Sequence, residues 1–280
     1  MIFTAAPLIQ VLPVWLRNEI TMEKLSQILE IRLRVGQAAE LITLKGSRWL
    51  ERLVDEDDLR FCMNIASKYS PWTVASHYHG FITIEGGHRI GISGNWIIDE
   101  SGRRSIQSLT SLCIRVSKDV LKVSRDLHKF QGSILIIGSP GSGKTTFLRD
   151  LVREISNNHI GSVCVVDERK ELFPMNANKM CYFPGSRTDV LSGCPKGEGV
   201  VMAIRCMAPK VVAVDEITAA EDCAALLEAG WCGVNILATA HASGREDLYK
   251  RPVYRPLLDN KLFQGLVIID RDKSWRFERM

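Results

Sequence analysis

The sequence predicts an α/β protein built on a parallel sheet and preceded by a smaller α+β domain. After about residue 130, strands that are apolar along their whole length alternate with amphipathic helices, which is typical of a buried parallel sheet. Before that point, short helical and strand patterns are mixed, and the charged segment 117–129 is expected to connect the two parts. We therefore expect an N-terminal α+β domain with its linker over residues 1–125 and the α/β domain over residues 126–280.

Composition narrows the class of protein. The 280 residues are 46% hydrophobic and 24% charged, as in globular proteins. The net charge of +4 is spread over both halves, so neither half has the basic excess expected of a nucleic acid-binding protein. The eight cysteines include no C-x-x-C pair, so we expect reduced thiols rather than a disulfide framework or zinc site. The apolar segment 1–16 is interrupted by prolines and is not expected to be an export signal, although a peripheral membrane contact stays open.

Periodicity predicts the individual elements. In the N-terminal part it predicts helices over 21–33 and 55–69 and a β-hairpin over 81–97 that turns at Gly86–Gly87. In the second part it predicts strands over 134–138, 162–166, 211–214, 235–239 and 265–269. The intervening helices are expected over 144–156, 198–207 and 219–230.

The strongest motif is a phosphate-binding loop. Residues 138–145 fit the pattern G-x-x-x-x-G-K-[ST] at every position, and they lie between an apolar strand and an amphipathic helix. The glycines allow backbone N–H groups to surround phosphates at the helix N-terminus. Lys144 is expected to reach the β- and γ-phosphates of ATP, and the Thr145 hydroxyl to bind Mg²⁺. The residues expected to bind the nucleotide are Gly138, Ser139, Pro140, Gly141, Ser142, Gly143, Lys144, Thr145 and Thr146.

Polar residues follow three other predicted strands. Since the carboxyl ends of parallel strands form one ligand-binding edge, these residues should meet at the phosphate loop. Asp215 is expected to hold Mg²⁺ through water, and Glu216 to orient and deprotonate the attacking water. Glu168 is the next candidate for the base, and His241 is expected to sense the γ-phosphate.

One further pattern invites a metal site. His77 and His79 form an H-x-H pair that would place both rings on one face of a strand, but no third ligand follows at a diagnostic spacing. We therefore expect surface histidines.

Taken together, these motifs resemble the secretion-ATPase superfamily, the RecA-like motors of type II and type IV secretion and of pilus assembly. The order is the same: a phosphate loop, an acidic box (Asp167 and Glu168), a Walker B strand and a histidine box (residues 239–242). The chain is more similar still to a family of stage III sporulation ATPases from endospore-forming bacteria. The matching stretches are residues 30–36, 86–91, 138–146, 166–169, 185–191, 203–209, 214–217 and 238–242. One departure is at Walker B, where Asp215-Glu-Ile-Thr218 replaces the Gly-Glu-Ile-Arg of secretion motors.

The resemblance implies a RecA-like P-loop ATPase that uses ATP and Mg²⁺. It implies a homo-oligomeric ring, expected to be hexameric, on the cytoplasmic mother-cell side of a channel, acting with membrane proteins of that channel. Motors of this type complete their sites with arginines from the N-terminal domain or a neighbouring subunit, and Arg89 and Arg115 are the candidates. A nucleic acid-linked RecA-like ATPase is the alternative, and a scaffold that binds ATP without useful turnover is a third interpretation.

Overall fold

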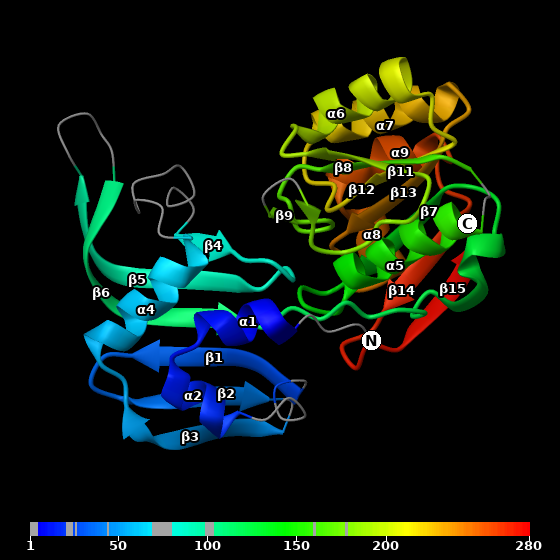
Figure 1. Ribbon diagram of the computed structural model, residues 1–280. Helices are drawn as coiled ribbons and strands as arrows, with labels where there is room; N and C mark the ends of the chain where they lie inside the picture. Colours follow the sequence, from blue (N-terminus) through cyan, green and yellow to red (C-terminus); the bar gives the residue numbers. More distant parts are fainter. Residues whose placement is uncertain are drawn as a thin grey trace. The chain divides into compact units, whose positions relative to one another are not determined.

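The computed structural model describes residues 5–20, 25, 27–43, 45–68, 80–98, 104–158, 161–176 and 179–280. The chain forms two compact units (Figure 1). The first comprises Met1–Asp119 with Asn176–Cys181, and the second comprises Val120–Met175 with Tyr182–Met280.

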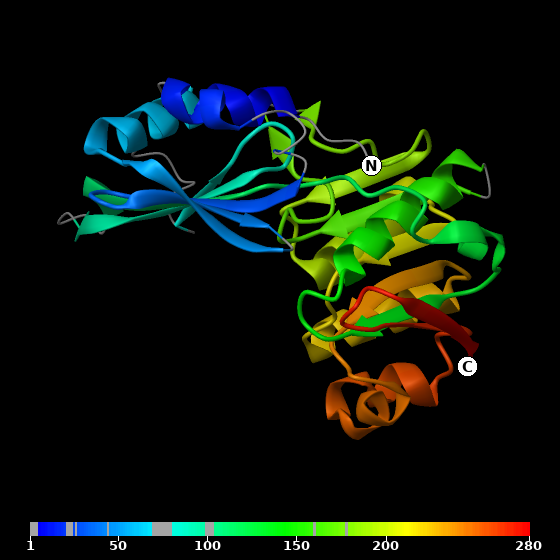
Figure 2. The same ribbon diagram turned by 90° about the horizontal axis from the view of Figure 1, so that it is seen from below.

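The first unit is a six-stranded antiparallel sheet with helices on one face, as Figure 2 shows. The strand order is β3-β2-β1-β6-β5-β4. Its strands are β1 Ile28–Arg34, β2 Ala38–Thr43, β3 Gly46–Leu53, β4 Phe81–Thr83, β5 Arg89–Ile98 and β6 Arg104–Arg115. Its helices are α1 Ala5–Val11, α2 Val14–Glu19 and α4 Glu56–Ala66. The α+β character predicted for this part is confirmed.

Within this unit one predicted element is wrong. Residues 28–34 form strand β1 instead of the second half of a helix over 21–33. Ile31 and Leu33 are fully buried, whereas Arg32 between them is not, and this period of two belongs to a strand. The hairpin is confirmed, because Phe81 pairs with Gly91 and Gly86–Gly87 form the turn. The helix expected over 55–69 is α4, and the Asp55 and Asp58 side chains cap its N-terminus reciprocally.

The apolar N-terminal segment packs into the core of this unit. Leu8, Leu12 and Leu16 are fully buried beside the apolar face of the sheet, and α1 also lies against α4. Among the described residues of this segment, most apolar side chains are therefore covered by their own unit, whereas Val14 is 63% exposed.

The second unit is a seven-stranded sheet of order β11-β8-β12-β13-β7-β14-β15, parallel except for β15 at one edge. Its strands are β7 Ile134–Gly138, β8 Val163–Asp167, β11 Thr188–Ser192, β12 Val211–Val214, β13 Asn235–Ala240, β14 Gly265–Ile269 and β15 Trp275–Arg279. Its helices are η2 Arg125–Lys129, α5 Lys144–Asn157, α6 Lys196–Met202, η3 Ala203–Met207, α7 Ala220–Trp231, α8 Arg245–Lys250, η4 Pro252–Tyr254 and α9 Arg255–Asp259. β9 Met175–Asn176 and β10 Lys179–Met180 form a separate two-stranded sheet, of which Asn176 and Lys179–Met180 belong to the first unit.

Helices cover both faces of this sheet. The strands are apolar on both faces because alternate residues enter two separate cores, one beneath α5 and the other beneath α6, α7, α8 and α9. The five predicted strands are confirmed, with shifts of a residue at some ends. The edge strands β11 and β15 were not predicted, since each is only partly buried and lacks an apolar run.

The remaining predictions concern membranes and metals. Among the described residues, every helix is too short or too polar to cross a membrane. All eight cysteines are free thiols, and the part of the chain that the structure describes holds no cluster of side chains suited to a metal ion. His77 and His79 lie outside the described residues.

Candidate nucleotide-binding site

The phosphate loop connects the end of β7 to the start of α5. Gly141 and Gly143 have φ angles of +75° and +106°, and a Cβ at either position would meet nothing within 4 Å. Glycine is needed there for backbone conformation, and the space beside the loop is open. At Gly138 the reason is different, because a Cβ would lie 2.5 Å from Ser142 Oγ. The glycines therefore determine the backbone shape of the loop, and the space beside Gly141 and Gly143 is open.

Lys144 lies in this turn as a buried cation. Its Nζ donates to the carbonyl oxygens of Gly138 at 2.9 Å and Ser139 at 3.0 Å. Burial lowers the pKa of the Lys144 ammonium below its usual value, and the negative charges of Asp215 and Glu216 partly oppose that shift. The ammonium is thus held at the mouth of the loop by weak acceptors that an anion could replace.

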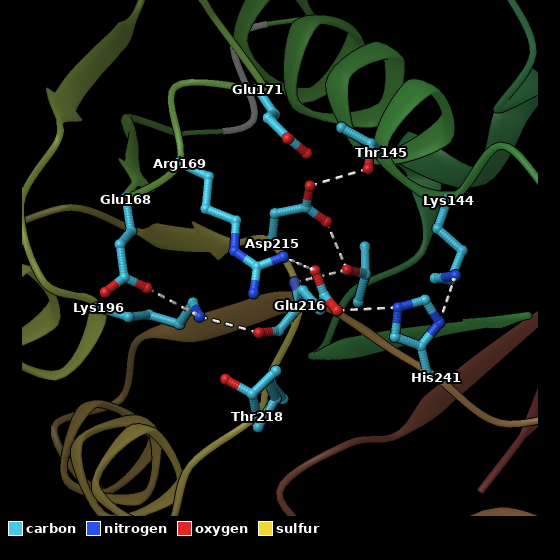
Figure 3. Close-up of polar contacts among 12 residues, drawn as sticks. Lys144, Thr145, Glu168, Arg169, Glu171, Lys196, Asp215, Glu216, Thr218 and His241 are labelled. Atoms are coloured by element: carbon cyan, nitrogen blue, oxygen red, sulfur yellow. Dashed lines mark hydrogen bonds and ion pairs between the residues drawn. The ribbon is translucent and has the colours of Figure 1, made fainter. Parts of the chain in front are cut away.

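Two threonines, Thr145 at the end of the loop and Thr239 on β13, contact the Asp215 carboxylate that follows β12 (Figure 3). Thr145 Oγ1 donates to Asp215 Oδ2 at 2.8 Å, and Thr239 Oγ1 donates to Asp215 Oδ1 at 2.5 Å. The same Thr239 oxygen accepts the backbone N–H of Glu216 at 2.7 Å. Three strand ends are therefore joined around one carboxylate, which supplies oxygen ligands of the kind Mg²⁺ prefers.

His241 links the loop to Glu216. Its Nδ1 lies 3.0 Å from Lys144 Nζ, and its Nε2 lies 2.9 Å from Glu216 Oε1. Because an ammonium can only donate, Nδ1 accepts and the proton on Nε2 is donated to the carboxylate. Arg169 forms an ion pair with the other oxygen of Glu216. The Glu216 carboxylate is therefore bound on both oxygens by side chains from two other strand ends.

The acidic box occupies a neighbouring position. Asp167 is buried, and its carboxylate accepts the backbone N–H groups of Glu171 and Phe173, both at 2.8 Å. Burial raises the pKa of Asp167, while these backbone hydrogen bonds act in the opposite direction. Glu168 instead faces the buried Lys196, with 3.4 Å between Nζ and Oε2. Asp167 thus fixes a turn, and Glu168 contacts Lys196 rather than the Glu216 carboxylate.

The two candidate arginines lie in the first unit. Arg89 on β5 and Arg115 on β6 are directly opposite each other in the antiparallel pair, and the Arg89 guanidinium lies 3.3 Å from the centre of the Phe81 ring. Other arginines of this unit have acidic partners: Arg32 with Glu30 at 2.6 Å is one such ion pair. Such pairing does not favour the nucleic acid-linked alternative.

Sequence reasoning overlooked three residues of this site. Thr239 lies at a strand end in the same short motif as His241, and this position could have identified it as a site residue. Arg169 directly follows the acidic box, which was equally visible. Lys196 gave no signal, because its partners Glu216, Asp222 and Glu168 are 20, 26 and 28 residues away along the chain.

Comparison with solved structures finds a similar fold in an ATPase and in a pilus retraction motor. The ATPase DotB of Legionella pneumophila superposes with a TM-score of 0.63 at 17% identity, over 92% of this chain and 77% of that chain. The pilus retraction motor PilT, solved with bound ADP, superposes with a TM-score of 0.57 at 16% identity, over 86% and 74% of the two chains. The predicted fold class, a RecA-like α/β domain preceded by a smaller α+β domain, is confirmed.

Sequence comparison gives the family. Stage III sporulation protein AA of Bacillus subtilis (strain 168) is 35% identical over 278 residues, covering 95% of this chain and 91% of that protein. The family described as sporulation stage III, protein AA, matches residues 6–276. A match over nearly the whole chain, together with this relative, means that the chain belongs to the stage III sporulation protein AA family.

Proposed function

We propose that this protein is a Mg²⁺-dependent ATPase whose turnover drives a membrane-associated channel assembly during spore formation. One observation carries the ATPase part of the proposal: the Thr145 hydroxyl at the end of the phosphate loop lies 2.8 Å from the Asp215 carboxylate at the end of β12. A loop that surrounds phosphates and a carboxylate that binds Mg²⁺ must meet in this way for a metal-bound nucleotide to be held.

The loop residues fit a polyphosphate. Ser142 Oγ is buried and, among the residues that the structure describes, has no hydrogen-bond partner. A buried hydroxyl without a partner costs free energy, and a phosphate oxygen would supply one. The open side of Gly141 and Gly143 leaves room for that group, and Lys144 supplies a positive charge beside it. Thr145 and Asp215 would hold Mg²⁺, which neutralises phosphate charge when bound.

Hydrolysis requires a base that activates water, and we assign that role to Glu216. Its carboxylate lies at the same strand ends as Thr145 and Asp215 and is oriented by His241. We assign His241 the role of a γ-phosphate sensor, since the same ring contacts both Lys144 and Glu216. A phosphate that attracts Lys144 would therefore also change the contact between His241 and the Glu216 carboxylate. Glu168 is the less favoured base, because it faces Lys196 and lies away from Thr145 and His241.

Arg89 and Arg115 are proposed to complete the site across a subunit boundary. They lie directly opposite each other in the β5–β6 pair, so two guanidinium groups are brought together on neighbouring strands, and guanidinium groups bind phosphate oxygens well. Arginines that reach a γ-phosphate in trans accelerate P-loop enzymes by about 10³–10⁵. This role implies a homo-oligomeric ring, which we expect to be hexameric and to act on the mother-cell side with membrane proteins of the channel.

The test is ATP hydrolysis by the purified protein. We expect Mg²⁺-dependent turnover whose specific rate rises with protein concentration, because the site is completed only in the ring. Mixing Arg115→Ala subunits with Lys144→Ala subunits should then restore activity, since some interfaces join an intact loop to an intact arginine. No turnover by the wild-type protein, with or without the channel proteins, would overturn the ATPase proposal. Failure of demonstrably mixed rings to recover would overturn only the role of Arg115.

A further inference from the structure

We propose that Lys196 is a positioning residue that holds Glu216 in the backbone conformation needed at the site. The proposal rests on the function assigned to Glu216 above. Lys196 Nζ donates to the backbone carbonyl oxygen of Glu216 at 2.8 Å, from the first turn of α6. Lys196 does not line the phosphate loop, so it would act on catalysis only through Glu216.

Glu216 needs such support because its backbone is in an unfavourable region. Its φ angle is +54°, in the left-handed region that residues with a Cβ rarely adopt. Strained residues of this kind persist only where surrounding contacts determine the conformation. Here the strand ends at Val214, and the chain must turn sharply at Glu216 for its side chain to face His241.

Both backbone polar groups of Glu216 are bound by other elements. Its N–H donates to Thr239 Oγ1 at 2.7 Å, and its carbonyl oxygen accepts from Lys196 at 2.8 Å. The next residue, Ile217, donates its N–H to the Thr239 carbonyl oxygen at 2.9 Å. Thr239 therefore fixes the turn from β13, and Lys196 fixes it from α6 on the other side of the peptide.

Lys196 is itself held in place by charge. It is 4% exposed, and its Nζ lies 3.4 Å from Glu168 and 3.5 Å from Asp222. Asp222 accepts the N–H groups of Thr218 at 3.1 Å and Ala219 at 3.2 Å, which are the residues leading into α7. The ammonium thus joins the residue after β8, the start of α6 and the start of α7 to the Glu216 turn.

The distances favour positioning over a purely stabilising ion pair. The contacts of Nζ with the two carboxylates are long, whereas the contact with the Glu216 carbonyl is a short charge-assisted hydrogen bond. Buried ion pairs add little net stability, because the cost of removing the charges from water offsets their attraction. The burial of Lys196 beside the strained Glu216 peptide is therefore better explained by positioning of that peptide than by a gain in stability.

The experiment compares Lys196→Met with the control Lys210→Met. Lys210 is an exposed lysine that directly precedes β12, the strand that leads to Glu216. We expect Lys196→Met to lower kcat for ATP about 10²-fold, as misplacement of a reacting group does, while KM for ATP stays unchanged. Lys210→Met should keep both constants. In a Glu216→Gln background, Lys196→Met should cause no further loss, because the two residues act as one unit.

Wild-type turnover in Lys196→Met, or a loss that multiplies with that of Glu216→Gln, would overturn the proposal. Should Lys196→Met not fold, Lys196→Gln is the second variant: it removes the charge, and its amide nitrogen lies one bond nearer the backbone than Nζ, so the hydrogen bond to the Glu216 carbonyl oxygen is lost. It should bind ATP and turn over more slowly than the wild type, and an equal rate would overturn the proposal. A wild-type protein without ATPase activity would defeat the proposed function instead. The crystal structure of whichever Lys196 variant folds gives a test that does not depend on activity. If residue 216 keeps its positive φ in that structure, the proposed role of Lys196 is refuted.

Discussion

The two halves of the candidate site are built in different ways. The phosphate-loop half comes from consecutive residues, and its shape depends on glycine backbone conformation at Gly141 and Gly143. The strand-end half brings Asp215, Glu216 and His241 together from β12 and β13 by side-chain contacts. The first half can form wherever its short sequence lies between a strand and a helix, whereas the second exists only in the assembled sheet. A substitution should therefore act locally in the first half and spread through several contacts in the second.

The largest effect should come from Glu216→Gln. The amide keeps the size of the side chain but cannot accept a proton from water, so kcat should fall by about 10²–10⁴. ATP binding should persist, because the loop half is untouched. Single-turnover hydrolysis measured beside ATP titration separates the two, and a wild-type rate would mean that the base lies elsewhere, with Glu168 next.

Lys144→Ala should do the reverse. It removes the cation of the loop half, and the affinity for ATP should fall by at least about 10²-fold, as expected for charged hydrogen bonds worth ~3 kcal/mol. The fold should remain, because among the described residues the ammonium bonds only to loop carbonyls and His241. Titration and thermal melting, with Lys210→Ala as the matched control, check both statements. Undiminished ATP affinity would contradict the assignment of the loop.

Thr239→Val tests whether the strand-end half is a connected unit. The valine has the same shape but leaves the Glu216 N–H without its acceptor, and Thr239 is fully buried. The free energy of unfolding should fall by about 1–3 kcal/mol, and kcat should fall with it. Thr239→Ser keeps the hydroxyl and should retain turnover. Urea unfolding and kinetics of both variants decide, and a Val variant with wild-type kcat would show that Glu216 is held without Thr239.

The smallest effect belongs to an exposed cluster just beyond His241. A hydrogen bond with Arg251 lowers the pKa of Asp247 to about 2, with help from the Ser243 N–H. Since the folded-state pKa lies below the usual 3.8, this contact stabilises the fold above that pH and loses its effect as the pH falls toward 2. Asp247→Asn should therefore lower the melting temperature slightly at neutral pH, and the difference should vanish in acid. A drop in kcat would mean that the exposed cluster belongs to the site.

This comparison also explains which features the sequence could predict. The phosphate-loop sequence and the apolar strands are local patterns; the strands are confirmed, and the loop sequence lies between a strand and a helix as its pattern requires. The error over residues 21–33 arose because apolar residues three and four positions apart fit a helix as well as they fit a strand. The register of β1 is decided by pairing with residues 111–115, far away in the chain. Lys196 could not be predicted for the same reason, since its role depends on the Glu216 peptide, which is 20 residues away along the chain.

The burial of α1 and α2 has a consequence for shortened forms of the protein. Leu8, Leu12 and Leu16 lie in the core of the first unit, so removing them would open a large apolar cavity there. Each buried leucine contributes about 2–5 kcal/mol, and a whole domain is stable by only about 5–15 kcal/mol. A protease that cut after Leu16 would therefore unfold the unit that carries Arg89 and Arg115, although both arginines remain in the chain. The phosphate loop, which has its own sheet, would be left in a folded domain without those two side chains in place.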